Sequence, residues 1–342
     1  MTRSAFLGFA CAAGLLAAFV GADATAAPGA SGLAVVSRID GPDGGWDYAS
    51  FDPVRRRVYI AHGTQVLAID ADTGKLNPDF APGDHLHAVV VVPGADVLVT
   101  TNSGDNSARI LGAKDGRLVT SIPTAKGADG AVYDPASRLV LVIDGDSGMI
   151  TLIDPRTRIS PGSITVGDSL EFGAVDGKGR FFDNVESKNE VAVVDIAARK
   201  VVARYPMPGC ERPTGLAFVA GNRLVSACAN GVAKILDAAS GREIASLKIG
   251  ARPDAVFYDP KRQLALIPSG LTGTLAVIAL SGAADNTIID TVPTQVGART
   301  GAVDPRTGRI WLPTAQYGPP ATAGGRPSPK PGTFQVLVLD RR

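Results

Sequence analysis

The chain has 342 residues with 34 basic and 33 acidic side chains, so its formal net charge is only +1. No run of five like charges occurs, and this balance argues against a large basic face for duplex nucleic acid. The 40 glycines and 24 prolines are high counts, and charged residues make up only 20% of the chain. This composition favours many short strands joined by tight turns over long helices.

The first 26 residues predict a secretory signal. Arg3 supplies a positive charge, residues 5–20 are almost wholly apolar, and residues 24–26 are small, as signal peptidase requires. We therefore expect cleavage near Ala26 and Ala27, and a periplasmic or secreted protein. A retained membrane anchor is the alternative, but the apolar run is shorter than the ~20 residues that a span needs. No membrane span is expected after signal removal.

One phrase recurs along the rest of the chain: a strand-like segment, a turn that is often Asp-Pro with a basic residue, and a second strand. Copies are DYASFDPVRRRVYI (47–60), DGAVYDPASRLVLV (129–142) and ARPDAVFYDPKRQLALI (251–267). The residues that open the units lie 40, 42, 42, 43, 40 and 46 residues apart. These opening residues are Asp47, His87, Asp129, Glu171, Thr214, Asp254 and Thr300.

Each unit continues with a third strand that ends in Asp, such as QVLAID, and a fourth strand after a turn such as DTGK. Period-two alternation and turn residues support strands at every step. Seven units of four strands and about 42 residues predict an all-β fold, a seven-bladed β-propeller that forms a single domain over residues 27–342.

The two ends of the repeat region predict how the ring closes. The seventh unit has only three strands, and the segment LAVVSRID (33–40) before the first blade resembles a fourth strand. We expect this N-terminal strand to join the last blade, which removes exposed sheet edges. The Pro/Gly-rich insertion at 316–332 in the last blade is predicted to be an extended surface loop.

These units resemble the YVTN/YncE-like seven-bladed propellers of bacterial envelopes. The resemblance rests on PDAVFYDP, on GAVYDPASRLVLV and on the D-x-x-[TS]-G-[KR] turns at 70–75 and 237–242. It covers essentially the whole chain after the signal and implies an exported propeller. The Gly-His pairs of WD repeats are missing, and the Trp-Asp pair occurs only once, at Trp46 and Asp47, without recurring from unit to unit. The repeated tryptophans of quinoprotein dehydrogenases and a Cys-x-x-Cys-His haem motif are missing as well.

The opening residues predict a polar ring at one mouth, because the first strand of each propeller blade lines the central axis. We expect Asp47, His62, His87, Asp129, Glu171 and Asp254 to bind a ligand there. Neighbouring loops add Asn102, Asp105, Asp144, Asn184, Glu186, Glu211, Asn230, Arg299 and Gln316. Crowded carboxylates favour a cation such as Ca²⁺. Each Asp taken singly also fits a structural role in closing a turn.

All three histidines fall in the first two units. His62 ends a second strand, and His85 and His87 share a face if their segment is extended. A Zn²⁺ or Cu²⁺ site of His62, His85 and His87 is therefore one hypothesis, since imidazole suits those metals. The other is that they are ordinary polar residues bonded to the backbone.

After signal removal Cys210 and Cys228 are the remaining cysteines, and in an oxidising compartment we expect them to form a disulfide. Cys210 precedes the first strand of the fifth unit and Cys228 ends the second. Simple hairpin register places Cys228 opposite about Gly215, so Cys210 must fold back over the mouth to reach it.

Three functions compete. The first is a binding or scaffold propeller, expected to be a monomer, that engages a small ligand, a metal or a protein partner at the mouth. The second is a metal-dependent hydrolase, lactonase or lyase that uses the ring, with His87 as base, although no nucleophile motif occurs. The third is binding of single-stranded nucleic acid, which needs exposed aromatic residues, and aromatic residues are only 6% of the chain.

Overall fold

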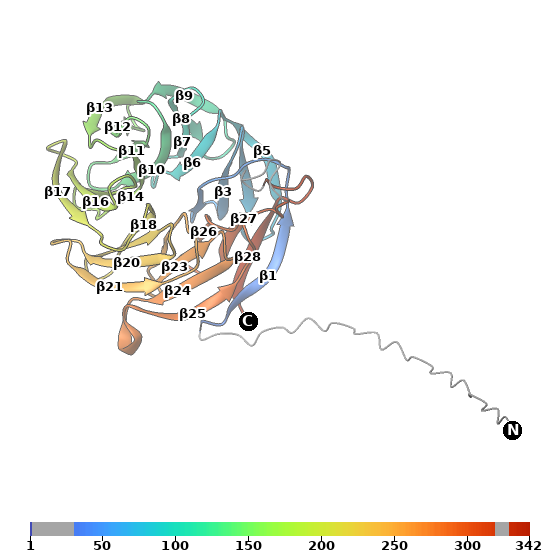
Figure 1. The fold of residues 1–342 in the computed structure, drawn as a ribbon. Coiled ribbons are helices and arrows are strands. Elements are labelled where there is room, and N and C mark those ends of the chain that lie inside the picture. Colours follow the sequence, from blue (N-terminus) through green and yellow to red (C-terminus); the bar gives the residue numbers. More distant parts are fainter. Residues whose placement is uncertain (2–30, 319–327) are drawn as a thin grey trace.

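The computed structural model describes residues 1, 31–318 and 328–342. Seven four-stranded antiparallel sheets follow one another around a central axis (Figure 1). The predicted seven-bladed propeller is therefore confirmed. The predicted signal sequence lies outside the described residues apart from Met1, and so does the middle of the 316–332 insertion.

The strands are named in chain order, and each blade runs from the axis outward. Blades 1 and 2 contain β2 (Ala49–Asp52), β3 (Arg57–His62), β4 (Gln65–Asp70), β5 (Leu76–Pro82), β6 (Leu86–Val91), β7 (Val97–Asn102), β8 (Ser107–Gly112) and β9 (Leu118–Pro123). Blades 3 and 4 contain β10 (Ala128–Asp134), β11 (Leu139–Asp144), β12 (Met149–Asp154), β13 (Ile159–Thr165), β14 (Leu170–Val175), β15 (Arg180–Val185), β16 (Glu190–Asp195) and β17 (Lys200–Pro206). Blades 5 and 6 contain β18 (Pro213–Val219), β19 (Arg223–Cys228), β20 (Val232–Asp237), β21 (Glu243–Lys248), β22 (Phe257–Asp259), β23 (Leu264–Ser269), β24 (Thr274–Ala279) and β25 (Thr287–Pro293). Blade 7 contains β26 (Ala302–Val303), β27 (Ile310–Thr314), β28 (Gln335–Arg341) and β1 (Leu33–Asp40).

Helix is almost absent from the described part of the chain, which has one 3-10 turn, η1 (Gly282–Ala284). None of its helices is long and apolar enough to span a bilayer.

The middle strands hold the blades together because both of their faces are buried. In β3, Tyr59 packs toward blade 2 with Leu98, and the next residue, Ile60, packs toward blade 7 with Trp311. Successive strand side chains point to opposite faces, so a strand between two neighbouring blades must be apolar at nearly every position. Sequence runs such as LVLVI (139–143) follow from this double burial.

The ring closes as the sequence predicted. β1 pairs antiparallel with β28, from Leu33 opposite Arg341 to Asp40 opposite Gln335. The last blade therefore combines both ends of the described chain (Figure 1). Ile39 of β1 packs against the apolar cluster between blades 7 and 1, which includes Trp311 and Val338.

Replacing Ile39 with Asp should lower the melting temperature by roughly 5–10 °C. A charge placed among apolar side chains costs several kcal/mol, and each kcal/mol is worth about 2–4 °C in a chain of this size. Val36→Asp is the matched control, because Val36 lies on the same strand and is 46% exposed. Calorimetry that finds equal shifts in the two variants would contradict this closure.

Candidate functional site

A β-bulge at the start of the first strands positions the ring side chains. In blade 2, Leu86 pairs with Asn102 and Val89 with Thr100, so His87 and Ala88 face a single residue. Register shifts at the same place in blades 3, 4 and 5 include Asp129, Glu171 and Thr214. An extra residue bends a strand and re-aims its side chain. In blades 2 to 5 the repeat thus presents a bulged residue at the end of the axis where the first strands begin, here called the ring mouth.

Blades 1, 6 and 7 reach the same mouth with less regular backbone. Both Asp47 and Tyr48 pair with Ala61, through N–H···O distances of 3.0 and 3.1 Å, which again places two residues opposite one. Asp47, Asp254 and Thr300 precede β2, β22 and β26, so the prediction that they begin regular strands is wrong for these three blades. Irregular pairing at the bulge ends the ladder early there.

Hydrogen bonds between blades fix the ring. The Thr300 hydroxyl donates to the Asp47 carbonyl at 2.7 Å, and the Asn184 amide donates to the Thr214 carbonyl at 2.6 Å. The Thr101 hydroxyl likewise donates to the Asp129 carbonyl. Because these donors hold the backbone of the next blade, the ring side chains are free to meet at the axis.

His87 joins three blades at the ring mouth. Its Nδ1 lies 2.7 Å from Asp47 Oδ2 and 3.4 Å from Asp129 Oδ1. Ligand atoms of these three residues all lie within 4.8 Å of one another, close enough for a metal ion. Residues 40 and 42 positions apart in sequence are therefore brought to one point.

Carboxylates crowd this point. Burial and the charge of Asp47 raise the pKa of Asp129 to about 7. Burial, together with the charges of Asp254 and Asp129, raises the pKa of Glu171 well above its usual value. Burial lowers the pKa of His87, but the hydrogen bond to Asp47 and the nearby negative charges outweigh it, so that pKa is raised. The site therefore favours added positive charge, whether a proton or a cation.

Arg299 supplies one cation at the rim. Its Nε donates to Asp254 Oδ2 at 2.7 Å, and its guanidinium lies 5.7 Å from the ring centre of Trp46. Burial still raises the pKa of Asp254 to about 6, although Arg299 lowers it. Arg299 thus offsets one carboxylate and leaves Asp47, Asp129 and Glu171 without an arginine partner among the described residues.

Ser103 is a site residue that the sequence analysis missed. Its hydroxyl lies 3.0 Å from His87 Nε2 and 2.7 Å from His85 Nδ1. Asp47, His87 and Ser103 therefore form a continuous hydrogen-bonded series. The signal that could have found Ser103 is its position after a second strand, in the same loop as Asn102 and Asp105.

Asp183 was missed as well. This carboxyl group is 0% exposed, and neither of its oxygens has a hydrogen-bond partner among the described residues. Burial raises its pKa well above the usual value. A buried aspartate in the middle of an apolar strand, FFDNV (181–185), was the available signal.

The three histidines do not form one ligand group in the described part of the chain. His85 and His87 lie together, with ring centres 4.9 Å apart. His62 is buried and packs against Phe334, with ring centres 4.5 Å apart. The loop at 41–46 covers it, since a Cβ on Gly44 would lie 2.4 Å from the His62 ring.

Most of the other predicted mouth residues tie down loops. The Asn102 side chain accepts from the Asp84 N–H at 3.0 Å, and the Asn230 side chain donates to the Gly209 carbonyl at 3.0 Å. Residues with salt-bridge or hydroxyl partners are Asp105 with Arg109, Glu186 with Arg212, and Asp144 with Thr151. Gln316 bonds through its backbone to Thr333, and Glu211 through its backbone to Asn230.

The predicted disulfide is present. Cys210 and Cys228 are bonded with Cα atoms 5.4 Å apart. The predicted register was wrong, because Cys228 pairs with Pro213 and not with Gly215. The bulge at Thr214 moves the pairing toward Cys210, so a short turn is enough to close the bond.

Neither a family model nor a curated protein matches this sequence. Two solved structures have the same fold. Kuenenia stuttgartiensis hydrazine synthase is 16% identical with a TM-score of 0.71, over 80% of this chain and 93% of that one. A chain of the mitotic checkpoint complex is 13% identical with a TM-score of 0.73, over 99% of both chains. At these identities the likeness shows the fold alone.

Removing the Asp129 carboxylate should stabilise the metal-free protein at high pH. Its folded pKa of about 7 exceeds the unfolded value of ~4. The folded state thus binds more protons between these values, and stability is lost as pH rises through 7. The melting temperature of Asp129→Asn minus that of the wild type should grow from near zero at pH 4.5 to roughly 5 °C at pH 8.5.

Asp105→Asn is the control for this titration. Burial raises the pKa of Asp105, but the hydrogen bonds from Ser107 and Arg109 lower it by a larger amount. The pKa of Asp105 therefore lies below its ordinary value. This variant should therefore show no gain in stability between pH 5 and 8.5. The melting temperatures are measured in the presence of a chelator. If the difference between Asp129→Asn and the wild type does not change with pH, as expected for Asp105→Asn, the ring carboxylates do not crowd one another.

Breaking the disulfide should cost about 3 kcal/mol of unfolding free energy by the chain-entropy model. Cys210→Ser combined with Cys228→Ser should therefore unfold at lower denaturant concentration, with a slope equal to or steeper than that of the wild type, because the uncrosslinked unfolded chain exposes more surface. Thiol titration of the denatured protein without reductant provides the second measurement. Two free thiols per chain would contradict the bond, and none is expected.

Proposed function

We propose that this protein is an exported binding propeller that holds a divalent metal ion at its ring mouth. The observation that carries the proposal is the meeting of Asp47, His87 and Asp129, one from each of three blades. Such a site would present the metal to a small ligand or a protein partner at the mouth.

The electrostatics of the ring support a cation. The raised pKa values of Asp129 and Glu171 mean that unbound carboxylates are costly there. A metal ion in place of the shared protons removes this cost, and its charge exceeds that of a proton. An ion also fits among three side-chain atoms without a larger pocket.

The donor set favours Zn²⁺ or a similar transition metal over Ca²⁺. One imidazole nitrogen and two carboxylates suit borderline metals, whereas Ca²⁺ prefers six to eight oxygens. The Ser103 hydroxyl at His87 Nε2 would fix the orientation of that ring once Nδ1 binds the metal. Asp47, His87 and Asp129 leave an open position for water or a ligand.

Export and family are part of the proposal. A disulfide fits an oxidising compartment, and the residues before the propeller have the pattern of a signal. Together with the repeat phrases, they support a place among the YVTN/YncE-like propellers. The structural neighbours come from an enzyme and from a multi-protein complex. The fold is therefore compatible with both catalysis and binding.

A metal-dependent hydrolase is the second candidate, favoured by the series of Asp47, His87 and Ser103. Its geometry matches an activated serine when His87 Nδ1 bonds to Asp47 rather than to a metal, because a metal on Nδ1 would leave the proton on Nε2. The Ser103 and Gly104 N–H groups, however, already donate to the carbonyls of His85 and Asp84 at 3.1 and 3.2 Å. They are thus not available to stabilise an oxyanion, and the nearby carboxylates would repel one, which is why binding ranks first.

Calorimetric titration of chelator-treated protein with ZnCl2 and CaCl2 tests the proposal. We expect one Zn²⁺ per chain, with weaker binding of Ca²⁺. His87→Ala and Asp129→Asn should each weaken Zn²⁺ binding tenfold or more, and binding should weaken as pH falls because the ligands must lose protons.

Asp105→Asn is the matched control, since it also removes a carboxylate from the mouth but lies outside the three-residue group. It should bind Zn²⁺ as the wild type does. Equal losses in Asp105→Asn and Asp129→Asn, or no Zn²⁺ uptake by the wild type, would reject the site. Ester hydrolysis that disappears in Ser103→Ala, with Zn²⁺ binding intact, would favour the hydrolase instead.

A further inference from the structure

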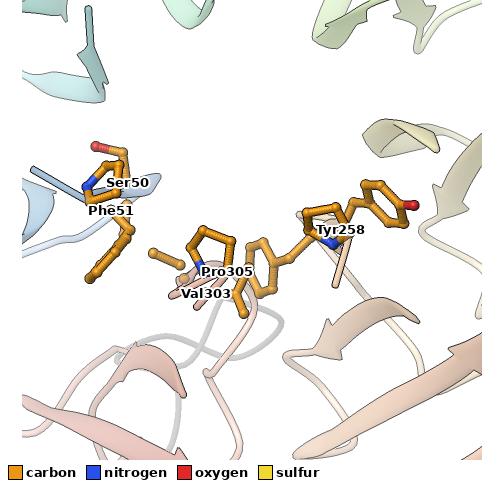
Figure 2. A pocket seen from close by; sticks show the side chains of 11 residues that line it. Ser50, Phe51, Tyr258, Val303 and Pro305 are labelled. Carbon is orange, nitrogen blue, oxygen red and sulfur yellow. The ribbon is translucent and has the colours of Figure 1, made fainter. Parts of the chain in front are cut away.

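The opposite end of the axis, where the first strands finish, has its own surface, here called the opposite mouth. A hollow of about 440 Å³ lies there between blades 1, 6 and 7. Figure 2 shows Ser50 and Phe51 on one side, Tyr258 on the other, and Val303 and Pro305 between them. A second hollow of about 380 Å³ adjoins it and shares residues 49–51.

This hollow is separate from the ring mouth. Asp47 and Pro53 are six residues apart on one nearly extended segment, or roughly 20 Å. The buried ring of Tyr48 lies between the two ends and packs against Phe172, with ring centres 4.5 Å apart. A ligand in the hollow would therefore not touch His87 or its carboxylate partners.

The lining of the hollow is mostly apolar. Phe51, Phe257, Tyr258 and Val303 are only partly buried and supply most of its wall. Ser50 contributes to both hollows, but its hydroxyl is inaccessible to solvent and therefore faces away from them. Small-molecule sites typically have volumes of 300–1,000 Å³, apolar walls and few polar groups.

The rim of the hollow is basic. The three turns that border it, at 52–57, 259–263 and 304–309, contain seven basic and three acidic residues. Those acidic residues are buried and are used within the turns: Asp52 accepts from the Arg55 N–H at 3.0 Å and Asp259 from the Arg262 N–H at 3.1 Å. Asp304 similarly accepts from the Arg306 N–H at 2.9 Å.

The surplus positive charge is exposed. Lys261 and Arg306 are solvent-exposed, have no carboxylate within salt-bridge distance among the described residues, and belong to turns that contribute Pro260 and Pro305 to the hollow. The two ends of the axis thus differ in chemistry, with carboxylates at the ring mouth and cations around an apolar hollow at the opposite mouth.

We propose that the opposite mouth binds a small amphiphilic anion, an apolar chain or ring that bears a carboxylate. Its apolar body occupies the hollow against Phe51, Tyr258 and Val303, and its carboxylate faces Lys261 and Arg306. This site goes beyond the metal proposed at the ring mouth and does not depend on it.

Fluorescence titration with two naphthalene probes tests the charge requirement. 1-Anilinonaphthalene-8-sulfonate is anionic, and N-phenyl-1-naphthylamine has the same aromatic frame without charge. We expect tighter binding of the anionic probe, and displacement of that probe by dodecanoate below its micelle concentration. Equal affinities, or no displacement by dodecanoate, would overturn the proposal.

Charge removal at the rim locates the site. Lys261→Gln with Arg306→Gln should weaken binding of the anionic probe about five- to tenfold and leave the neutral probe unchanged. Arg156→Gln with Lys178→Gln is the matched control, because these exposed cations lie on blades 3 and 4, outside the two hollows. Equal effects of the two pairs would show that net charge alone attracts the probe and would refute the site.

Val303→Glu provides a readout that does not depend on the rim. A carboxylate inside the hollow should abolish binding of the anionic probe. The melting temperature of this variant reports whether the propeller stays intact. An intact Val303→Glu protein that still binds the anionic probe as the wild type does would contradict the assigned hollow.

Discussion

The candidate site depends on one extra residue at the start of the first strand in blades 1 to 6. In blades 1 to 5 that residue makes two positions face one, and in blade 6 the pairing between Pro253–Ser269 and Phe257–Leu266 shifts by the same amount. A regular ladder would keep the side chains of these positions on the faces of the blade. The bulge turns them toward the axis, where carboxylates from separate blades meet and repel one another.

The fold could be predicted from the sequence because its causes are local and periodic. Asp-Pro turns recur near the end of first strands, and the Asp side chain in Asp52 or Asp259 accepts the N–H groups of its own turn. Middle strands such as LVLVI (139–143) are apolar throughout because blades cover both faces. Repetition of these two features was enough to place seven blades and the closing strand.

Site geometry could be predicted only in part, because register and loop packing are not periodic. The hairpin register next to the turn would place Cys228 opposite Thr214, one residue from the expected Gly215, and the bulge moves its partner one residue further, to Pro213. His62 was predicted to meet His87, but the loop at 41–46 covers it and Phe334 packs on it. Asp47, His87 and Asp129 lie together as the repeat implied, while Ser103 and Asp183 have no counterpart in a repeat-based argument.

The central claim is that crowded carboxylates make the ring mouth a cation site, and the titration of Asp129 tests it most directly. Carbon-13 NMR of the aspartate carboxyl groups, with Asp129→Asn to assign the signal, follows this group alone. In metal-free protein Asp129 should titrate near pH 7, and saturating Zn²⁺ should move its midpoint below the normal value of ~4. A midpoint near 4 without metal, unchanged by Zn²⁺, would contradict the account.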